Sequence, residues 1–98
     1  MKNQKTVVAI RLTEYADKIG ADIIVRRVSA SGQTKSFFAC AFAKLFAINK
    51  SNNIMAGQSG IGSTYWEAMA NYAIKIRGKI LRSSITQRQF RAPKNLVG

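Results

Sequence analysis

Residues 64–77, Thr-Tyr-Trp-Glu-Ala-Met-Ala-Asn-Tyr-Ala-Ile-Lys-Ile-Arg, predict a helix that packs one face against the rest of the chain. Thr64 and Glu67 stand three positions apart, the spacing at which a hydroxyl and a carboxylate cap the first N–H groups of a helix. Lys75 and Arg77 fall in the last turn, where cations favour the helix dipole, and Gly78 ends the helix. An apolar stripe at three- and four-residue spacing is expected to face the core: Tyr65, Met69, Tyr72, Ala73 and Ile76.

The segments before this helix predict extended strands. Residues 6–12 are rich in β-branched side chains, and residues 22–29 form a second strand in which Arg26 and Arg27 point to opposite faces. Residues 30–33 form a turn, and residues 34–42 return as a third strand, which makes a β-hairpin. Residues 49–62 lack periodicity and predict a loop.

Some segments admit two interpretations. Residues 13–19 fit either a helical turn or continued extended chain. Between residues 34 and 46 a strand is expected, with a helical turn near Leu45, but phenylalanines at four-residue spacing (Phe38, Phe42 and Phe46) also suit a helix. Residues 79–90 fit a strand or a short helix, and residues 92–98 are expected to be a flexible tail.

These elements predict an α+β fold in a single domain spanning residues 1–98. We expect an antiparallel sheet of three or four strands, packed on one face by helix 64–77. The chain has 98 residues, of which 47% are hydrophobic, enough for one core. The longest apolar run, residues 37–43, is too short to span a bilayer.

The composition argues against catalysis and against a bound metal or cofactor. The chain has no histidine, so the commonest general base and metal ligand is missing, and a single cysteine cannot complete a zinc site. Glu14 and Asp17 share a helical face, where they offset nearby cations. Cys40 sits in an apolar run with no base beside it and is expected to be buried. A lone cysteine also suits a reducing compartment, so we expect a cytoplasmic protein.

The charge balance is the strongest functional signal. Sixteen Lys and Arg against four Asp and Glu give a formal charge of +12, and residues 68–98 contain seven cations and no acid. Such a field attracts polyanions through counterion release. We therefore expect the partner to be nucleic acid or a protein–nucleic acid complex, with an acidic protein surface as a further possibility. The residues expected to contact it are Arg26, Arg27, Lys75, Arg77, Lys79, Arg82, Arg88 and Arg91.

The glycine-rich segment 57–64 resembles the P-loop of nucleotide-binding proteins, with two glycines separated by four residues before the helix. Ser63 stands where that family has its lysine, so NTP hydrolysis is excluded. Glycines before a helix start can still hold one phosphate oxygen. The candidate contacts for such an anion are Gln58, Ser59 and Ser63.

Two strands, a glycine-rich loop and a C-terminal helix are similar to the second half of double-stranded-RNA-binding domains. That family opens the helix with Ser-Lys-Lys, whereas this chain has Ser63-Thr64-Tyr65. The resemblance covers about half of the chain and implies contacts to phosphates.

Two functions of different classes follow. The first is non-enzymatic binding of nucleic acid or a nucleoprotein complex. The second is inhibition of a host nucleic-acid-processing complex by blocking its nucleic-acid channel, in the style of phage anti-defence proteins such as anti-CRISPR proteins. Trp66 and Tyr65 at the helix start are candidates for stacking on bases or for anchoring a protein interface.

Overall fold

The computed structural model describes residues 8–29, 36–55 and 57–98. It is an α+β fold in which antiparallel sheets are packed by a helix of the C-terminal half, as the sequence predicts. The strands divide between two three-stranded antiparallel sheets rather than one. Sheet B has the order β2-β3-β5 and sheet C the order β4-β6-β7, while β1 and β8 form a short parallel pair.

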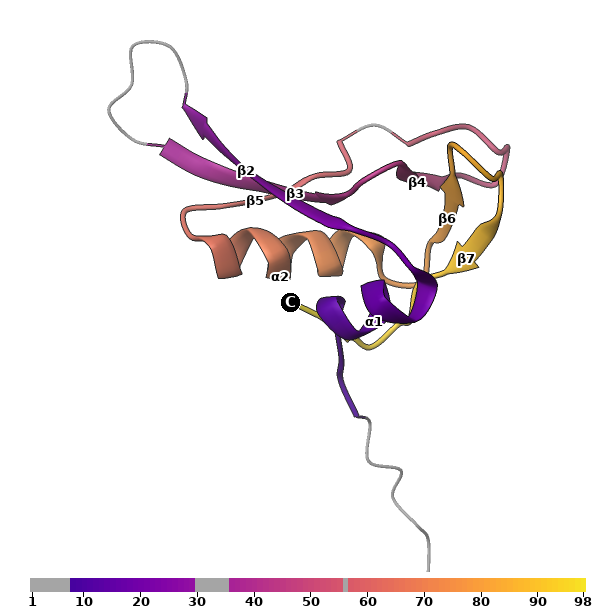
Figure 1. Cartoon of the computed structure of the whole chain (residues 1–98), viewed down its shortest axis with the longest axis horizontal. Coiled ribbons are helices and arrows are strands. Elements are labelled where there is room, and N and C mark those ends of the chain that lie inside the picture. Colours follow the sequence, from indigo (N-terminus) through magenta and orange to yellow (C-terminus); the bar gives the residue numbers. More distant parts are fainter. Residues whose placement is uncertain (1–7, 30–35, 56) are drawn as a thin grey trace, which may run out of the picture.

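Sheet B lies over the long helix α2 (Figure 1). It contains the expected hairpin of β2 (Ile23–Ser29) and β3 (Ser36–Phe42), with β5 (Gly60–Gly62) on the other side of β3. The turn expected at residues 30–33 lies outside the described residues. Residues 49–62 are therefore not all loop, because their last three residues pair with β3.

Sheet C is built from β4 (Leu45–Ile48), β6 (Ile80–Ser83) and β7 (Gln89–Arg91). The chain passes from sheet B to sheet C through a turn at Ala43 and Lys44, where Lys44 adopts a φ of 58°. Among the described residues 36–46 the helical interpretation is wrong, because they form β3 and the start of β4. The helical turn expected near Leu45 is wrong for the same reason, since Leu45 begins β4. Residues 79–90 contain β6 and the start of β7, which settles the choice there in favour of strands.

The helix α2 (Tyr65–Ile76) has the predicted N-terminal cap, because Thr64 Oγ1 accepts a hydrogen bond of 3.1 Å from the Glu67 N–H. Its buried face contains four of the five residues expected there. Tyr65 is the exception, since 46% of its surface is exposed. It lies in the first turn, where it packs edge-to-face on Trp66 with ring centroids 5.2 Å apart.

The strand expected at residues 6–12 is short in the described part of the chain. Only β1 (Ile10–Arg11) is extended, and α1 (Leu12–Ile19) begins immediately after it. Leu12, Tyr15 and Ile19 recur at helical spacing and bring their apolar side chains to one face. Gly20 ends the helix with a φ of 70°.

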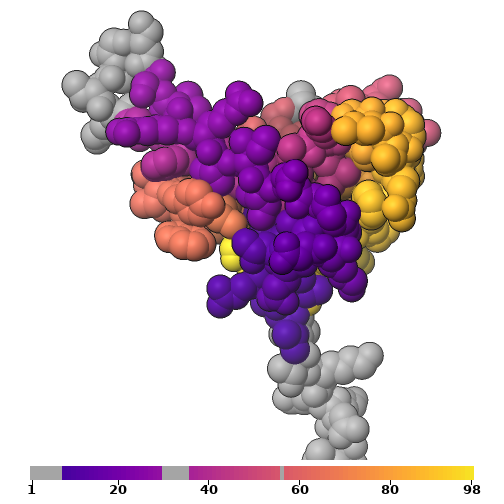
Figure 2. Space-filling view, in the orientation of Figure 1, coloured from indigo at the N-terminus to yellow at the C-terminus, as the bar shows by residue number. Residues whose placement is uncertain are grey.

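The expected flexible tail at residues 92–98 is instead packed into the fold. β8 (Leu96–Val97) pairs in parallel with β1, and Leu96 is fully buried. In the space-filling view the C-terminal residues, in yellow, lie between α2 in orange and the indigo N-terminal segment (Figure 2). The prediction fails because a two-residue strand has no periodicity and its partner lies near the other end of the chain.

One hydrophobic core joins both sheets and both helices. Phe42 lies at its centre, with its ring 5.4 Å from Tyr72 and 6.1 Å from Tyr15 between ring centroids. The buried residues of the core are Leu12, Tyr15, Ala16, Cys40, Phe42, Leu45, Ala47, Ala68, Met69, Tyr72, Ala73, Ile76, Leu81, Ala92 and Leu96.

Candidate nucleic-acid interface

The turn that follows α2 brings cations from three segments together. Gly78 adopts a φ of 67°, its N–H donates to Ala92 O at 3.0 Å, and Ala92 N donates to Lys79 O at 2.9 Å. These two backbone hydrogen bonds place the segment after β7 beside the turn. Arg91 Nη1 then donates to Gly78 O at 3.0 Å, and the Lys94 stem passes within van der Waals reach of Gly78. We call this group the Gly78 cluster: Arg77, Lys79, Arg91 and Lys94.

Arg77 has a fixed position within the Gly78 cluster. Its Nε donates a hydrogen bond of 2.6 Å to the Leu96 carbonyl in a partly buried contact. The C-terminal segment is thereby tied to the end of α2, and among the described residues the terminal N–H groups of the guanidinium have no hydrogen-bond acceptor. Because one edge of the guanidinium is held by this hydrogen bond, its other edge is preorganised to donate hydrogen bonds to a phosphate.

Lys75 lies in the last turn of α2 but serves mainly to hold a loop. Its ammonium donates to Gly57 O at 3.0 Å and to Ser59 O at 2.8 Å. With Lys79 it lines a cavity of about 220 Å³ whose other walls are mostly apolar. The residues that line this cavity are Ala47, Met55, Gly57, Gln58, Lys75, Ile76 and Lys79.

Arg82 lies on the face of sheet C that points away from the core. The cross-strand register pairs it with Phe46 on one side and Gln89 on the other. Ile80 and Arg91 form the neighbouring row of the same face, since residues two apart on a strand share a face. Arg91 therefore belongs both to this outer face and to the Gly78 cluster, and it makes them one continuous surface.

The remaining predicted cations lie elsewhere. Arg88 is next to the β6–β7 turn with its guanidinium carbon 5.4 Å from the centre of the Phe90 ring, a cation–π distance. Arg26 and Arg27 are neighbours on β2 and face opposite sides of sheet B, and Arg27 donates to Ser36 Oγ at 2.9 Å. The β2–β3 hairpin and sheet C lie at opposite ends of the molecule (Figure 1), so the eight predicted cations do not form one patch.

The glycine-rich loop is organised by packing against α2. A Cβ atom on Gly60 would overlap the backbone of Tyr72 and Ala68, and one on Gly62 would lie 2.5 Å from the Ala68 nitrogen. Only glycine allows the backbone of β5 to approach the helix this closely. The two glycines that resemble a phosphate-binding loop are thus explained by strand–helix contact.

Gln58 and Ser63, two of the three candidate residues of this loop, use their side chains for hydrogen bonds within the protein. Gln58 bonds both the N–H and the carbonyl of Ala47 and the carbonyl of Met55. Ser63 donates from its hydroxyl and its N–H to the Glu67 carboxylate, at 3.1 and 3.4 Å. That carboxylate occupies the helix start where an anion would bind and would repel it. Ser59 contributes its carbonyl to Lys75, so we leave Gln58, Ser59 and Ser63 out of the proposed interface.

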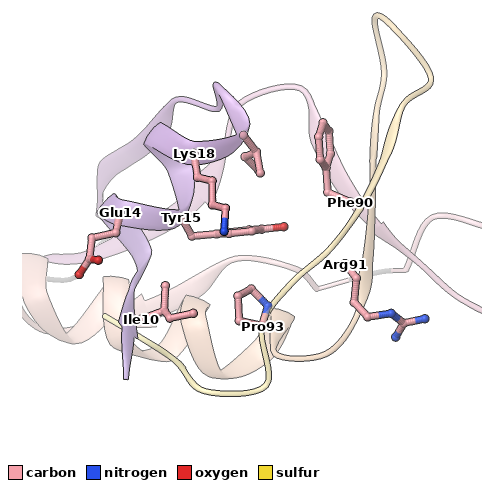
Figure 3. Close-up of a pocket in the computed structure, with 8 residues that line it drawn as sticks. Ile10, Glu14, Tyr15, Lys18, Phe90, Arg91 and Pro93 are labelled. Atoms are coloured by element: carbon pink, nitrogen blue, oxygen red, sulfur yellow. The ribbon is translucent and has the colours of Figure 1, made fainter. Parts of the chain in front are cut away.

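A cavity of about 440 Å³ lies between α1 and the segment around β7 (Figure 3). The Tyr15 ring extends across it toward Phe90 and Pro93, whereas Glu14 points away. The Tyr15 hydroxyl is buried and has no hydrogen-bond partner among the residues described. Burial raises the pKa of Tyr15, so the phenol stays protonated at neutral pH.

Cys40 is fully buried, as predicted, in the middle of β3. Burial raises the pKa of the Cys40 thiol to about 11. Burial is also the main reason why the pKa of the Tyr72 phenol is raised to about 12. The nucleophilic thiolate form is therefore scarce at neutral pH.

Within the described ranges, no cluster of three metal-ligating side chains occurs. Neither helix is long and apolar enough to cross a membrane, judged over the same residues.

Three residues of the continuous surface were not among the sequence-based candidates: Phe46, Gln89 and Lys94. The four-residue spacing of Phe46 from Phe42 suits the helical interpretation of residues 34–46. In the structure Leu45 and Ala47 are buried and Phe46 is exposed, but residues 45–48 are all apolar, so the sequence carries no alternation that would have placed Phe46 outside. The chain matches no protein-family model, no curated protein and no solved structure.

Proposed function

We propose that the protein binds nucleic acid, or a complex that contains it, through the Gly78 cluster and the adjoining outer face of sheet C. The observation that carries the proposal is the convergence of Arg77, Lys79, Arg91 and Lys94 on one turn. Hydrogen bonds to backbone carbonyls hold two of them in place. Residues 68–98, which supply all four, contain no carboxylate side chain.

Electrostatics supports a polyanion as the partner. Four like charges on one turn repel each other, and the repulsion is relieved when they meet phosphates. Each phosphate that a Lys or Arg neutralises also releases counterions from the nucleic acid, which adds affinity independent of sequence. Guanidinium groups can donate to two phosphate oxygens at once, which suits Arg77 and Arg91.

Fluorescence anisotropy with labelled single-stranded DNA, single-stranded RNA and duplex DNA over a salt series tests the proposal. The double variant Lys79→Glu/Lys94→Glu should weaken binding at least about tenfold and lower the salt slope by about two, since two phosphate contacts are lost. The control Lys18→Glu/Lys44→Glu removes the same charge outside the cluster and should change affinity less than about threefold. Equal losses in both double variants would contradict a localised interface.

A second candidate function is favoured by the exposed face of sheet B. Ile24 and Ile61 are exposed there, on the side turned away from α2, and Arg26 is the one charged side chain of that face among the residues described. An apolar face of this kind favours contact with a protein over contact with phosphates. We propose as the alternative a phage-type inhibitor that docks on a nucleic-acid-processing complex and blocks its channel. Negligible binding of bare nucleic acid at physiological salt would favour it.

A further inference from the structure

The outer face of sheet C carries an aromatic ring on its edge strand β4. Phe46 is 37% exposed, whereas its neighbours Leu45 and Ala47 are buried on the opposite face. Arg82 lies directly across from Phe46 on β6, and Gln89 lies across from Arg82 on β7. Neighbouring strands are about 4.8 Å apart, so the guanidinium and the ring lie within reach of a single ligand.

The polar side chains around this ring are all donors or cations. Arg82 and Arg91 supply guanidinium groups from β6 and β7, and Gln89 supplies an amide between them. The strands of sheet C, residues 45–48, 80–83 and 89–91, contain no acidic residue. A flat face with one aromatic ring, two guanidinium groups and an amide matches an unpaired base with its flanking phosphates.

We propose that this face binds single-stranded nucleic acid, with one base stacked on Phe46 and the neighbouring phosphates held by Arg82 and Arg91. The inference rests on the proposed function and names the substrate class of the same surface. Single strands are favoured over duplexes because a duplex keeps its bases stacked on each other, whereas an unpaired base offers a free π-face. Phosphates that run on from Arg91 reach the Gly78 cluster.

The first test compares two truncations of exposed aromatic rings. Phe46→Leu keeps an apolar side chain on the strand but removes the ring, and it should weaken binding of a decathymidylate and of a decauridylate about tenfold. Binding of a ten-base-pair DNA duplex should change less than twofold. Trp66→Leu tests the other stacking candidate, since Trp66 is 71% exposed but lies on α2. Its affinities should stay within about twofold of the parent protein, and a loss equal to that of Phe46→Leu would contradict a stacking platform on sheet C.

The second test reads stacking directly. In a Trp66→Leu background, Phe46→Trp leaves one tryptophan, placed on the outer face of sheet C. Stacking of a thymine or uracil on the indole should quench its fluorescence in a saturable titration, at the concentrations that give half-maximal anisotropy. The duplex should produce little quenching.

The outcomes separate this inference from the proposed function. If Phe46→Leu binds single strands like the parent while Lys79→Glu/Lys94→Glu still weakens binding, the stacking platform is wrong and nucleic-acid binding stands. If the parent protein binds neither single strands nor duplexes, the stacking inference and direct binding of bare nucleic acid both fail. A duplex bound more tightly than a single strand would also overturn the stacking inference.

Discussion

Gly60 lies directly against the backbone of Tyr72, so close that a single added methyl group would overlap the helix. The contact joins the first residue of β5 to the buried face of α2, and Gly62 makes the same kind of approach one turn earlier on the helix, at Ala68. The glycine-rich loop therefore sets how sheet B sits on its helix. Its two central glycines are required by packing, whatever the loop contacts outside the protein.

We expect Gly60→Ala to destabilise the protein by about 3 kcal/mol or more, because neither strand nor helix can move away without breaking the sheet B contacts. Gly57→Ala is the control. Gly57 has open space around it, and its φ of 66° should limit the cost to about 1 kcal/mol. Urea unfolding followed by circular dichroism measures both values, and equal losses would show that the close approach is not what matters.

Ile76→Asp should unfold the protein. Ile76 is 1% exposed on the core face of α2, and an unpaired carboxylate there loses its hydration without gaining a partner. Ile74→Asp, two residues earlier on the same helix, should remain folded because 55% of Ile74 is exposed. Thermal unfolding of the two variants compares the faces of α2. A folded Ile76→Asp variant would mean that the helix face is assigned incorrectly.

Tyr15→Phe should stabilise the protein by about 1 kcal/mol. The Tyr15 hydroxyl is buried without a hydrogen-bond partner among the described residues, so removing it relieves a desolvation cost while the ring keeps its contact with Phe42. The midpoint of urea unfolding should rise with no change in its slope. A lower midpoint would indicate that the hydroxyl is satisfied in solution.

Stability should decline as the pH rises above 9. Burial raises the pKa of the Cys40 thiol from 9.0 to about 11. The thiol therefore loses its proton at lower pH in the unfolded chain than in the folded protein, and the free energy of unfolding falls between pH 9 and about pH 11. Tyr72, with its pKa raised to about 12, extends the decline to higher pH. Cys40→Ala should flatten the curve of unfolding free energy between pH 9 and 10. An unchanged curve would assign the decline to the tyrosines alone.

Much of the fold could be predicted because its signals are local. Helix 64–77 has a cap, a periodic apolar stripe and a glycine stop within fourteen residues, and α2 forms there. The alternation in residues 22–29 likewise predicts β2 and the opposed Arg26 and Arg27. For α1 the sequence does not decide between helix and extended chain, because its eight residues cover only about two helical turns of apolar periodicity.

For the interface, the sequence by itself determined its chemistry. Sixteen cations against four acids require a surface of one sign, and the run without acids in residues 68–98 places most of that excess in one part of the chain. These properties depend on composition, and no arrangement of the chain removes them. They favour a polyanion as the proposed partner but locate no site.

Only the tertiary structure decided which cations act together. Arg91 and Arg77 converge because the Gly78 N–H donates to the Ala92 carbonyl and the Ala92 N–H donates to the Lys79 carbonyl. Phe46 joins their surface because a turn at Lys44 moves the chain into a second sheet. The packing of Leu96 under β1 is settled in the same way. Such pairings follow from long-range contacts that minimise exposed apolar area and unpaired backbone groups, and no local pattern encodes them.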